Sequence, residues 1–401
     1  MFLKETGRLI LYDTSNYTDF PIGGQLTSVS NFLHFVAEIH PARTERMVLV
    51  GVTTDPSAVG KFSAVERFGR KFTFLPVCAA DTDLAHTAHS LRLSFAKGIL
   101  RYGKMLRIRR EDLHYIQTPE AVGPIKALYP GAHYCIFSHG SYANMERGFR
   151  FFRNNPMIRR GFRHYLHFVL RGADLIFILD EDSRRAYMPY NRHLVLAHNS
   201  IVLPSSYEQF DATARACRGR LLFVGRLSKD KGVDGIIRAA YLLRREWKDV
   251  QLTIVGEGEA GSALRALDRS LAGESGFSSP VRFVGAVAPS DVSSLMDGAD
   301  ILIMNSAFEG VPMTILEALS HGLPVVTTNV GGIASAVHFR EDAEETDGTP
   351  EEIAEAVKRI AADYSAYAQS AHDHAAAFDY REVNREIYEE LSAVQQSILK
   401  K

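Results

Sequence analysis

Short apolar runs alternate with longer amphipathic stretches along most of this 401-residue chain. Alternating strands and helices fold into parallel sheets that helices cover on both faces, so this pattern predicts an α/β protein with doubly wound sheets. The expected strands are residues 9–12, 47–52, 72–77, 114–117, 133–137, 174–179, 220–224, 252–255, 281–284, 301–304 and 324–328. The clearest helical patterns are residues 26–38, 84–103, 120–128 and 380–399.

Length and composition limit the possible classes of protein. At this length two domains are favoured over one, and we place them at residues 1–203 and 204–383, with part of 384–401 packing back on the first. The strand at 174–179 is expected to be the last of the first domain, and the acidic stretch 341–355 is expected to be a loop leading into a helix at Pro350. The formal net charge of −1 argues against a general nucleic-acid binder.

Cysteine usage and hydropathy bear on the compartment. The three cysteines are widely spaced and form no CxxC pair, so they indicate neither a disulfide framework nor a zinc site. No window approaches 18 apolar residues, and the N-terminal apolar run is too short for a signal peptide. We therefore expect a cytoplasmic protein, either soluble or held peripherally at a membrane.

The stretch 300–333 places two carboxylates around a strand–loop–helix junction. The buried strand 301–304 is followed by a polar loop, and Pro312 suits the first position of a short helix that ends at Gly322. Free backbone N–H groups at the helix start, together with the helix dipole, favour a phosphate there. Glu309 lies in the loop, and Glu317 lies away from the centre of the apolar arc of the helix, so it is not expected to be a core residue.

A second anion site is indicated by the segment 225–232, which follows the strand 220–224. Arg226 can bind a diphosphate through a fork of N–H groups, while Lys231 acts as a point charge. A solvated surface charge pair is the alternative. Gly23 and Gly24 precede the helix 26–38, where glycine permits close approach of an anion or simply a tight turn.

A literal GxGxxG runs from Gly256 to Gly261 after the strand 252–255, as in nicotinamide-dependent dehydrogenases. That fingerprint also requires an acidic residue at the end of the next strand, about 20 residues on, to bind the ribose. The strand 281–284 ends instead in Gly285-Ala286-Val287, which argues against a dehydrogenase.

Three further features have both a structural and a functional interpretation. His139 follows the strand 133–137, at the edge where open α/β sheets place ligands, although a lone histidine is more often structural. Asp81-Thr82-Asp83 is a DxD pair that could hold a metal, but helix-capping acids explain it better. The segment Arg147–Arg171 interleaves arginine with phenylalanine and contains no acid, so it is either a solvated helix face or a surface that meets anionic lipid.

The string from Glu309 to Glu317, with Gly-Val-Pro inside it and Gly-Leu-Pro-Val-Val after it, closely resembles the signature of the retaining glycosyltransferases of family 4. The resemblance is dense from 221 to 333 and patchy before that. It implies the GT-B fold: two Rossmann-like domains facing a central cleft, with a C-terminal helix crossing back to the first. Asn199-Ser200-Ile201 lacks the Gly and Asp usual in the family's linker, which puts the linker contacts in doubt.

The same resemblance implies a role for each matching residue. A sugar would pass from a UDP-, GDP- or ADP-sugar to a saccharide or lipid-linked acceptor, without a metal. A non-catalytic GT-B partner subunit and, less well supported, the dehydrogenase are the alternatives. Catalytic roles fall to His139, Arg226, Lys231 and Glu309. Donor-binding roles fall to Gly23, Gly24, Gly256, Glu257, Gly258, Gly310, Val311, Pro312, Met313, Thr314 and Glu317.

Overall fold

The computed structural model describes residues 7–18, 24–80, 91–139 and 156–400. The chain divides into two compact units, Met1–Asn199 with Tyr380–Lys401 and Ser200–Asp379. Both crossings lie slightly before the positions expected from sequence. Ile201 explains the first crossing, because it is buried in the core of the second unit and its backbone N–H donates to the carbonyl of Phe378 at 2.9 Å.

In the described part of the first unit, eight strands form one sheet in the order β3-β4-β2-β1-β5-β6-β7-β8. Every pairing is parallel except that of β3 with β4. The strands are β1 Leu9–Asn16, β2 Met47–Thr53, β3 Ser63–Arg67, β4 Arg70–Ala79, β5 Leu113–Ile116, β6 His133–Phe137, β7 Leu175–Ile178 and β8 Leu194–Leu196.

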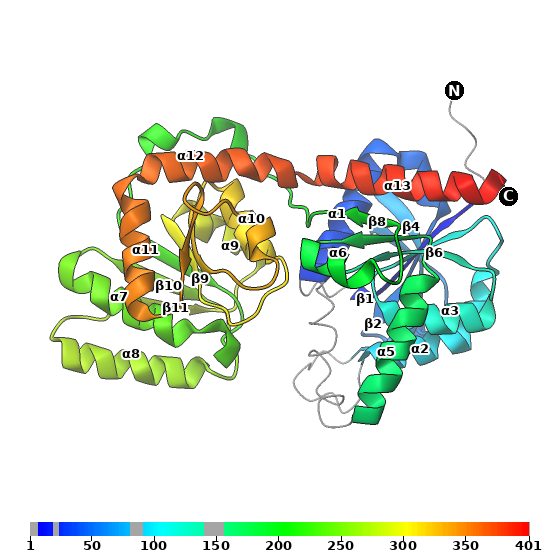
Figure 1. The fold of residues 1–401 in the computed structure, drawn as a ribbon, viewed down its shortest axis with the longest axis horizontal. Coiled ribbons are helices and arrows are strands. Elements are labelled where there is room, and N and C mark those ends of the chain that lie inside the picture. The colour runs from blue at the N-terminus through cyan, green and yellow to red at the C-terminus, as the bar shows by residue number, and fades with distance from the viewer. Residues whose placement is uncertain (1–6, 19–23, 81–90, 140–155, 401) are drawn as a thin grey trace. The chain divides into compact units, whose positions relative to one another are not determined.

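Helices cover both faces of this sheet (Figure 1). Alternate residues of the central strands point to one face and pack with α2, α3 and α5 in a single core cluster. On the other face α1 packs against the sheet, with the ring of Phe32 5.3 Å from that of Tyr115, and α13 packs on α1. The helices are α1 Gly24–Ile39, α2 Leu91–Tyr102, α3 Val122–Leu128, α5 Pro156–Arg171, α6 Glu181–Tyr187 and α13 Tyr380–Lys400.

The terminal helix α13 therefore belongs to the first unit although it follows the second in sequence, as the GT-B resemblance implied. Its Gln395 is buried and its amide donates to the carbonyls of Arg8 and Glu111, both at 3.1 Å. Arg381 pairs with Glu38 of α1 at 3.1 Å. These contacts join α13 to the residues just before β1 and β5 and to α1.

In the second unit, six described strands form a sheet in the order β11-β10-β9-β12-β13-β14, and every pairing is parallel. The strands are β9 Arg220–Val224, β10 Gln251–Val255, β11 Val281–Gly285, β12 Ile301–Met304, β13 Val325–Thr328 and β14 Ala343–Thr346. The helices are α7 Val233–Glu246, α8 Gly261–Ser275, α9 Pro289–Asp297, α10 Met313–Ser320, α11 Pro350–Ala362 and α12 Tyr364–Ala375.

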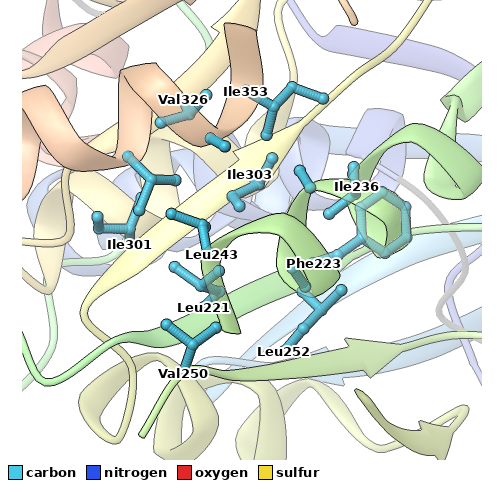
Figure 2. Packing of buried hydrophobic residues seen from close by; sticks show 14 of the residues in the cluster. Leu221, Phe223, Ile236, Leu243, Val250, Leu252, Ile301, Ile303, Val326 and Ile353 are labelled. Atoms are coloured by element: carbon cyan, nitrogen blue, oxygen red, sulfur yellow. The ribbon is translucent and has the colours of Figure 1, made fainter. Parts of the chain in front are cut away.

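Two hydrophobic clusters hold these helices to opposite faces of the second sheet. One joins the strands to α7, α8 and α11, and Figure 2 shows Leu221, Phe223 and Ile303 of the sheet facing Ile236 and Ile353 of the helices. The other joins the strands to α9, α10 and the end of α12. Burial on both faces accounts for the apolar runs at residues 221–224 in β9 and 301–304 in β12.

The fold confirms the predicted two-unit α/β architecture and corrects two details. The strand at 175–178 is not the last of the first unit, because β8 follows it and pairs with it. The stretch 341–355 is not a plain loop, because it contains β14; the acidic Glu344 of that strand is buried against Arg359, at 2.7 Å, and the hydroxyl of Tyr367. The predicted helix 84–103 is described only as α2, since residues 81–90, including Asp81 and Asp83, lie outside the described residues.

Candidate functional site

The loops that follow the strands of the second sheet lie side by side at its carboxyl edge. Parallel strands end at one edge, so the segments after β9, β10 and β12 are brought together by the strand order. Backbone hydrogen bonds join them: Leu227 N donates to the carbonyl of Glu257 at 2.9 Å, and Ala307 N donates to that of Asp230 at 2.8 Å. Three segments predicted separately from sequence thus form one surface.

The ammonium group of Lys231 and the carboxylate of Glu309 meet at the centre of this surface. Nζ of Lys231 donates a hydrogen bond to Oε1 of Glu309, and Ser306 Oγ donates to the same oxygen at 2.6 Å. Their side chains are 18% and 11% exposed, so the pair is shielded but still reachable. An ammonium group has three N–H donors, which leaves Lys231 with capacity for a second anionic partner.

Arg226 lies on the same loop and is exposed to solvent. Leu227, the next residue, is buried in the core of the unit and fixes the start of the loop. A 3₁₀ turn, Lys229–Lys231, then leads into Gly232, which has φ +56° and precedes α7. This left-handed position favours glycine. The structure therefore places Arg226 directly before a buried anchor and Lys231 at the end of a fixed turn.

Gly256 and Gly258 allow the loop after β10 to approach the backbone of the loop after β9 closely. A Cβ on Gly256, which has φ +126°, would lie 1.9 Å from the carbonyl oxygen of Gly225. A Cβ on Gly258 would lie 2.4 Å from that of Leu227. Because both positions are filled by the neighbouring loop of the same unit, the GxGxxG pattern here has a local structural explanation, and the dehydrogenase interpretation loses its main support.

Sequence reasoning missed Asn305, which holds two of these loops together. The side chain is buried, and its Nδ2 donates to the carbonyls of Gly232 and Gly348, both at 3.1 Å. A Cβ on Gly232 would lie 2.4 Å from the carbonyl oxygen of Asn305. The sequence offered a signal for this role. Asparagine follows an apolar strand directly, and an isolated glycine, Gly348, follows β14.

The glycine pair that follows β13 was also missed. A Cβ on Gly331, with φ +62°, would lie 1.9 Å from the carbonyl oxygen of Glu309. Gly332 N donates to the carbonyl of Gly310 at 2.9 Å. The loop that carries Glu309 therefore packs against the backbone of Gly331 and Gly332, at a distance that only glycine permits.

The predicted helix after this loop is α10, and Pro312 is its N-cap rather than its first residue. Val311, Met313 and Thr314 at its start are partly exposed, whereas Ile315, Leu316 and Leu319 are completely buried. Glu317 is partly exposed, and its immediate surroundings raise the pKa of its carboxyl group by desolvation. Glu317 is thus outside the core, as expected, but it is not an ordinary solvated glutamate.

In the first unit, His139 lies at the carboxyl end of β6. Its Nε2 is 2.6 Å from Oε1 of Gln117, which follows β5, and its ring centroid is 4.7 Å from that of Phe137. Burial lowers the pKa of His139 to about 3, so the imidazole is neutral at pH 7. Since a glutamine oxygen only accepts, Nε2 carries the proton and Nδ1 is an acceptor. Gly24 begins α1, and Gly23 lies outside the described residues.

The comparisons with known proteins agree with this geometry. Residues 218–363, which include all the loops described above in the second unit, match the family model described as glycosyl transferases group 1. The two cations and two carboxylates predicted from sequence all lie inside the matched residues.

Curated proteins that resemble this chain match only part of it. A D-inositol 3-phosphate glycosyltransferase of Corynebacterium urealyticum is 33% identical over 42% of this chain and 41% of its own length. A glycogen synthase of Mycobacterium tuberculosis is 38% identical over 29% of this chain and 27% of its own length. The chain thus spans less than half the length of these relatives.

Solved structures match over nearly the whole chain. Sucrose-phosphate synthase of Thermosynechococcus elongatus superposes with a TM-score of 0.72 at 17% identity, covering 96% of this chain and 99% of that one. Anabaena HepE in complex with UDP superposes with a TM-score of 0.65 at 19% identity, covering 96% and 100%. At this identity the likeness establishes the fold, which is GT-B.

Proposed function

We propose that this chain is a retaining glycosyltransferase that moves a hexose-type sugar from a nucleoside-diphosphate sugar to an acceptor. The observation that carries the proposal is the contact between Lys231 and Glu309, which joins two loops within the residues that match the group 1 glycosyl transferase model, beside the start of α10. Solved structures with the same fold include complexes with UDP and with UDP-glucose, which supports a nucleotide sugar as the donor.

The charges of this surface suit departure of a diphosphate. As the bond between the sugar and phosphate breaks, negative charge grows on phosphate oxygens and positive character grows on the sugar ring. Arg226, Lys231 and the N-terminus of α10, preceded by Gly310 and Val311, would stabilise the phosphate. Lys231 keeps its bond to Glu309 as it binds, because its other N–H donors can meet the diphosphate.

The two carboxylates have separate tasks in this proposal. Glu309, with the backbone of 310–313, would hold hydroxyl groups of the donor sugar, and Glu317 would accept hydrogen bonds from the ribose. Gly256, Glu257 and Gly258 would border the base. Transfer would retain the anomeric configuration by front-face attack, in which the leaving phosphate takes the proton of the acceptor. No enzyme nucleophile and no metal are required in this route.

The first unit would bind the acceptor. Its candidate group, His139, is neutral at pH 7 and presents an acceptor nitrogen at Nδ1, which suits a hydroxyl group rather than an anion. A saccharide or a lipid-linked saccharide fits that chemistry. Assembly of a cell-surface polysaccharide or glycolipid at the inner face of the cell membrane is the setting we propose, by analogy with the family alone.

A panel of donors tests the function. Purified chain is incubated with UDP-, GDP- and ADP-sugars, and release of the nucleoside diphosphate is measured with and without a set of saccharide acceptors. We expect one donor class to support release, to remain active in the presence of EDTA, and to give a product with the anomeric configuration of the donor. A chain that binds none of these nucleotides would refute the proposal.

Two alternatives give different results in the same assay. A non-catalytic partner subunit would bind a nucleoside diphosphate but show no turnover alone, and its retention of Arg226, Lys231 and Glu317 would then lack a purpose. A dehydrogenase would bind a nicotinamide dinucleotide in preference to UDP, GDP or ADP. We expect no such preference, because the glycines of its fingerprint are occupied by the loop at 225–227.

A further inference from the structure

One helical face of the first unit carries cations and exposed apolar side chains from two distant parts of the sequence. The first part is α2 and the turn after it, residues 91–110, which contain no aspartate or glutamate. Leu93, Leu100 and Met105 of this part are 59%, 48% and 44% exposed, unusually so for large apolar side chains. The exposed cations among them are Arg92, Lys97, Arg101, Lys104, Arg107, Arg109 and Arg110.

The second part is α5, residues 156–171, which also contains no acid. Its inner side is fixed by Leu166, Val169 and Leu170, all buried in the core of the unit. Its outer side exposes Met157 and Phe168, at 83% and 52%. The exposed basic residues on that side are Arg160, Arg163, His164 and Arg171.

These two parts lie on the same face of the sheet. Both pack into one hydrophobic cluster, and α3 contacts both of them: it packs on α2, and the hydroxyl of Tyr165 in α5 accepts a hydrogen bond from Gly123 N at 3.0 Å. Figure 1 shows α2, α3 and α5 grouped together in this unit. Only the second part was predicted from the sequence, as the basic stretch Arg147–Arg171, and residues 147–155 of that stretch lie outside the described residues.

The neighbouring helix α6 shows what an ordinary surface of this unit looks like. There Arg184 lies 3.3 Å from Glu181, and Arg185 lies 2.6 Å from Asp182, so the helix neutralises its own charge. By contrast, residues 91–110 and 156–171 contain no acid, and Arg92 and Arg109 lie 3.2 and 4.0 Å from Glu120 and Glu111, which are outside these segments. Since the whole chain carries a net charge of −1, this basicity is local.

We propose that the face formed by α2, residues 103–110 and α5 docks on an anionic lipid bilayer. Cations attract the negative headgroups, while side chains such as Leu93, Met157 and Phe168 can enter the boundary between headgroups and acyl chains. Exposed aliphatic side chains favour a bilayer over a nucleic acid, whose phosphates would leave them in water. None of the described helices has the length and apolar character needed to cross a bilayer. The inference goes beyond the proposed transfer reaction and does not depend on it.

Vesicle flotation with the full chain tests the proposal. Vesicles of phosphatidylcholine alone are compared with vesicles containing equal parts of phosphatidylcholine and phosphatidylglycerol, at low and high salt. We expect binding to the anionic vesicles only, weakened by salt because exposed charges are screened. Equal binding to both kinds of vesicle, or binding to neither, would overturn the proposal.

Three sets of variants make the test specific to this face. Lys97→Gln with Lys104→Gln, and separately Arg160→Gln with Arg163→Gln, should each lower the vesicle partition coefficient roughly 25-fold, at about fivefold per cation. Arg245→Gln with Arg269→Gln, two exposed arginines of α7 and α8, is the matched control and should leave it unchanged. An equal fall in the control pair would show nonspecific attraction and refute the assignment.

A fourth variant separates a bilayer from any other polyanion. Leu93→Gln with Phe168→Gln keeps every charge and should lower vesicle binding at least tenfold, while leaving binding to a single-stranded oligonucleotide unchanged. If this variant bound vesicles as well as the parent chain, the surface would be a general polyanion site and the bilayer proposal would fail. Circular dichroism and thermal unfolding of each variant confirm that the fold is retained.

Discussion

The two units share a helix-covered parallel sheet but close the carboxyl ends of their strands differently. In the second unit, a lysine and a glutamate meet at this edge, and the loops that carry them are locked by glycine-dependent backbone contacts. In the first unit, Asp13 lies within β1, and Gln117 and His139 lie just after β5 and β6. Asp13 accepts from the hydroxyls of Ser15 and of Thr118, the latter at 3.3 Å, and His139 bonds Gln117.

This difference shows that the sheet supplies only the position of a site. Under the proposed function, the charged edge of the second unit suits a leaving diphosphate, whereas Gln117 and the neutral imidazole of His139 in the first unit suit hydroxyl groups. The same contrast extends to backbone freedom, because the edge of the second unit depends on glycines that no other residue can replace without strain. Four changes would break or sharpen this comparison.

The largest effect is expected at Gly256. Replacing it with alanine would force a Cβ to 1.9 Å from the carbonyl oxygen of Gly225 at φ +126°, so Gly256→Ala should cost the second unit about 3 kcal/mol or more in free energy of unfolding. Urea unfolding followed by the fluorescence of Trp247, the sole tryptophan of the chain, reports on this unit.

Gly273→Ala is the control for that change. Gly273 lies in α8 with nothing within 4 Å of a Cβ, so alanine should stabilise the helix by about 1 kcal/mol. Similar midpoints for both alanine variants would show that the close approach between the loops at 225 and 256 is not needed for stability.

The next largest effect is expected at Lys231. Lys231→Ala removes a charged contact to the diphosphate and leaves Glu309 without its cation, so turnover should fall roughly 100-fold, equivalent to about 2.7 kcal/mol. Lys229→Ala removes an exposed charge from the same turn and should change turnover less than about threefold. Steady-state rates with the best donor of the panel decide this, and a near-normal rate for Lys231→Ala would exclude it from catalysis.

Acid should affect the first unit through His114 on β5. The residue is fully buried beside the hydroxyl of Tyr12, at 3.0 Å, and burial lowers its pKa to about 3. Below pH 6.5 the unfolded chain takes up a proton that the folded imidazole cannot, so stability is lost as pH falls, by about 2 kcal/mol between pH 7 and pH 5. His139 acts in the same direction.

Urea unfolding at the two pH values, followed by circular dichroism, measures this loss. His114→Leu should reduce the dependence on pH, while the transition reported by Trp247 in the second unit should keep its own dependence. An unchanged pH slope in His114→Leu would mean that this histidine is not the source.

The smallest effect is expected at Glu317. Desolvation raises the pKa of this carboxyl group, so the folded protein bears a cost for its charge that is absent below the unfolded pKa, grows as pH rises toward the folded pKa and is complete above it. Glu317→Gln should therefore be more stable than the parent chain at pH 7, with no difference below pH 4. The same variant should lose about tenfold in kcat/KM if Glu317 binds the ribose as an anion. Thermal unfolding and steady-state rates of Glu317→Gln test both expectations. A gain in stability with no loss of activity would contradict the proposed role of Glu317 in binding the ribose.

Much of the fold followed from local patterns. The bounds of β6, β9 and β12 were predicted correctly, because an apolar run bounded by polar turns is sufficient to mark a buried parallel strand. β14 was missed because its sequence, AEET, carries two glutamates, and only the tertiary contacts of Glu344 make it a strand. β3 was missed because its antiparallel pairing is on an edge, where burial is one-sided.

The sequence by itself determined which residue types stand after which strands, including the two cations after β9 and the two glutamates around α10. Tertiary structure alone decided that Lys231 and Glu309, 78 residues apart, would meet, that Asn305 would join the loops beside them, and that α2 would share a face with α5. The physical reason is that local periodicity fixes where a strand lies in the chain, whereas strand order, here β9 beside β12, fixes which strand ends become neighbours.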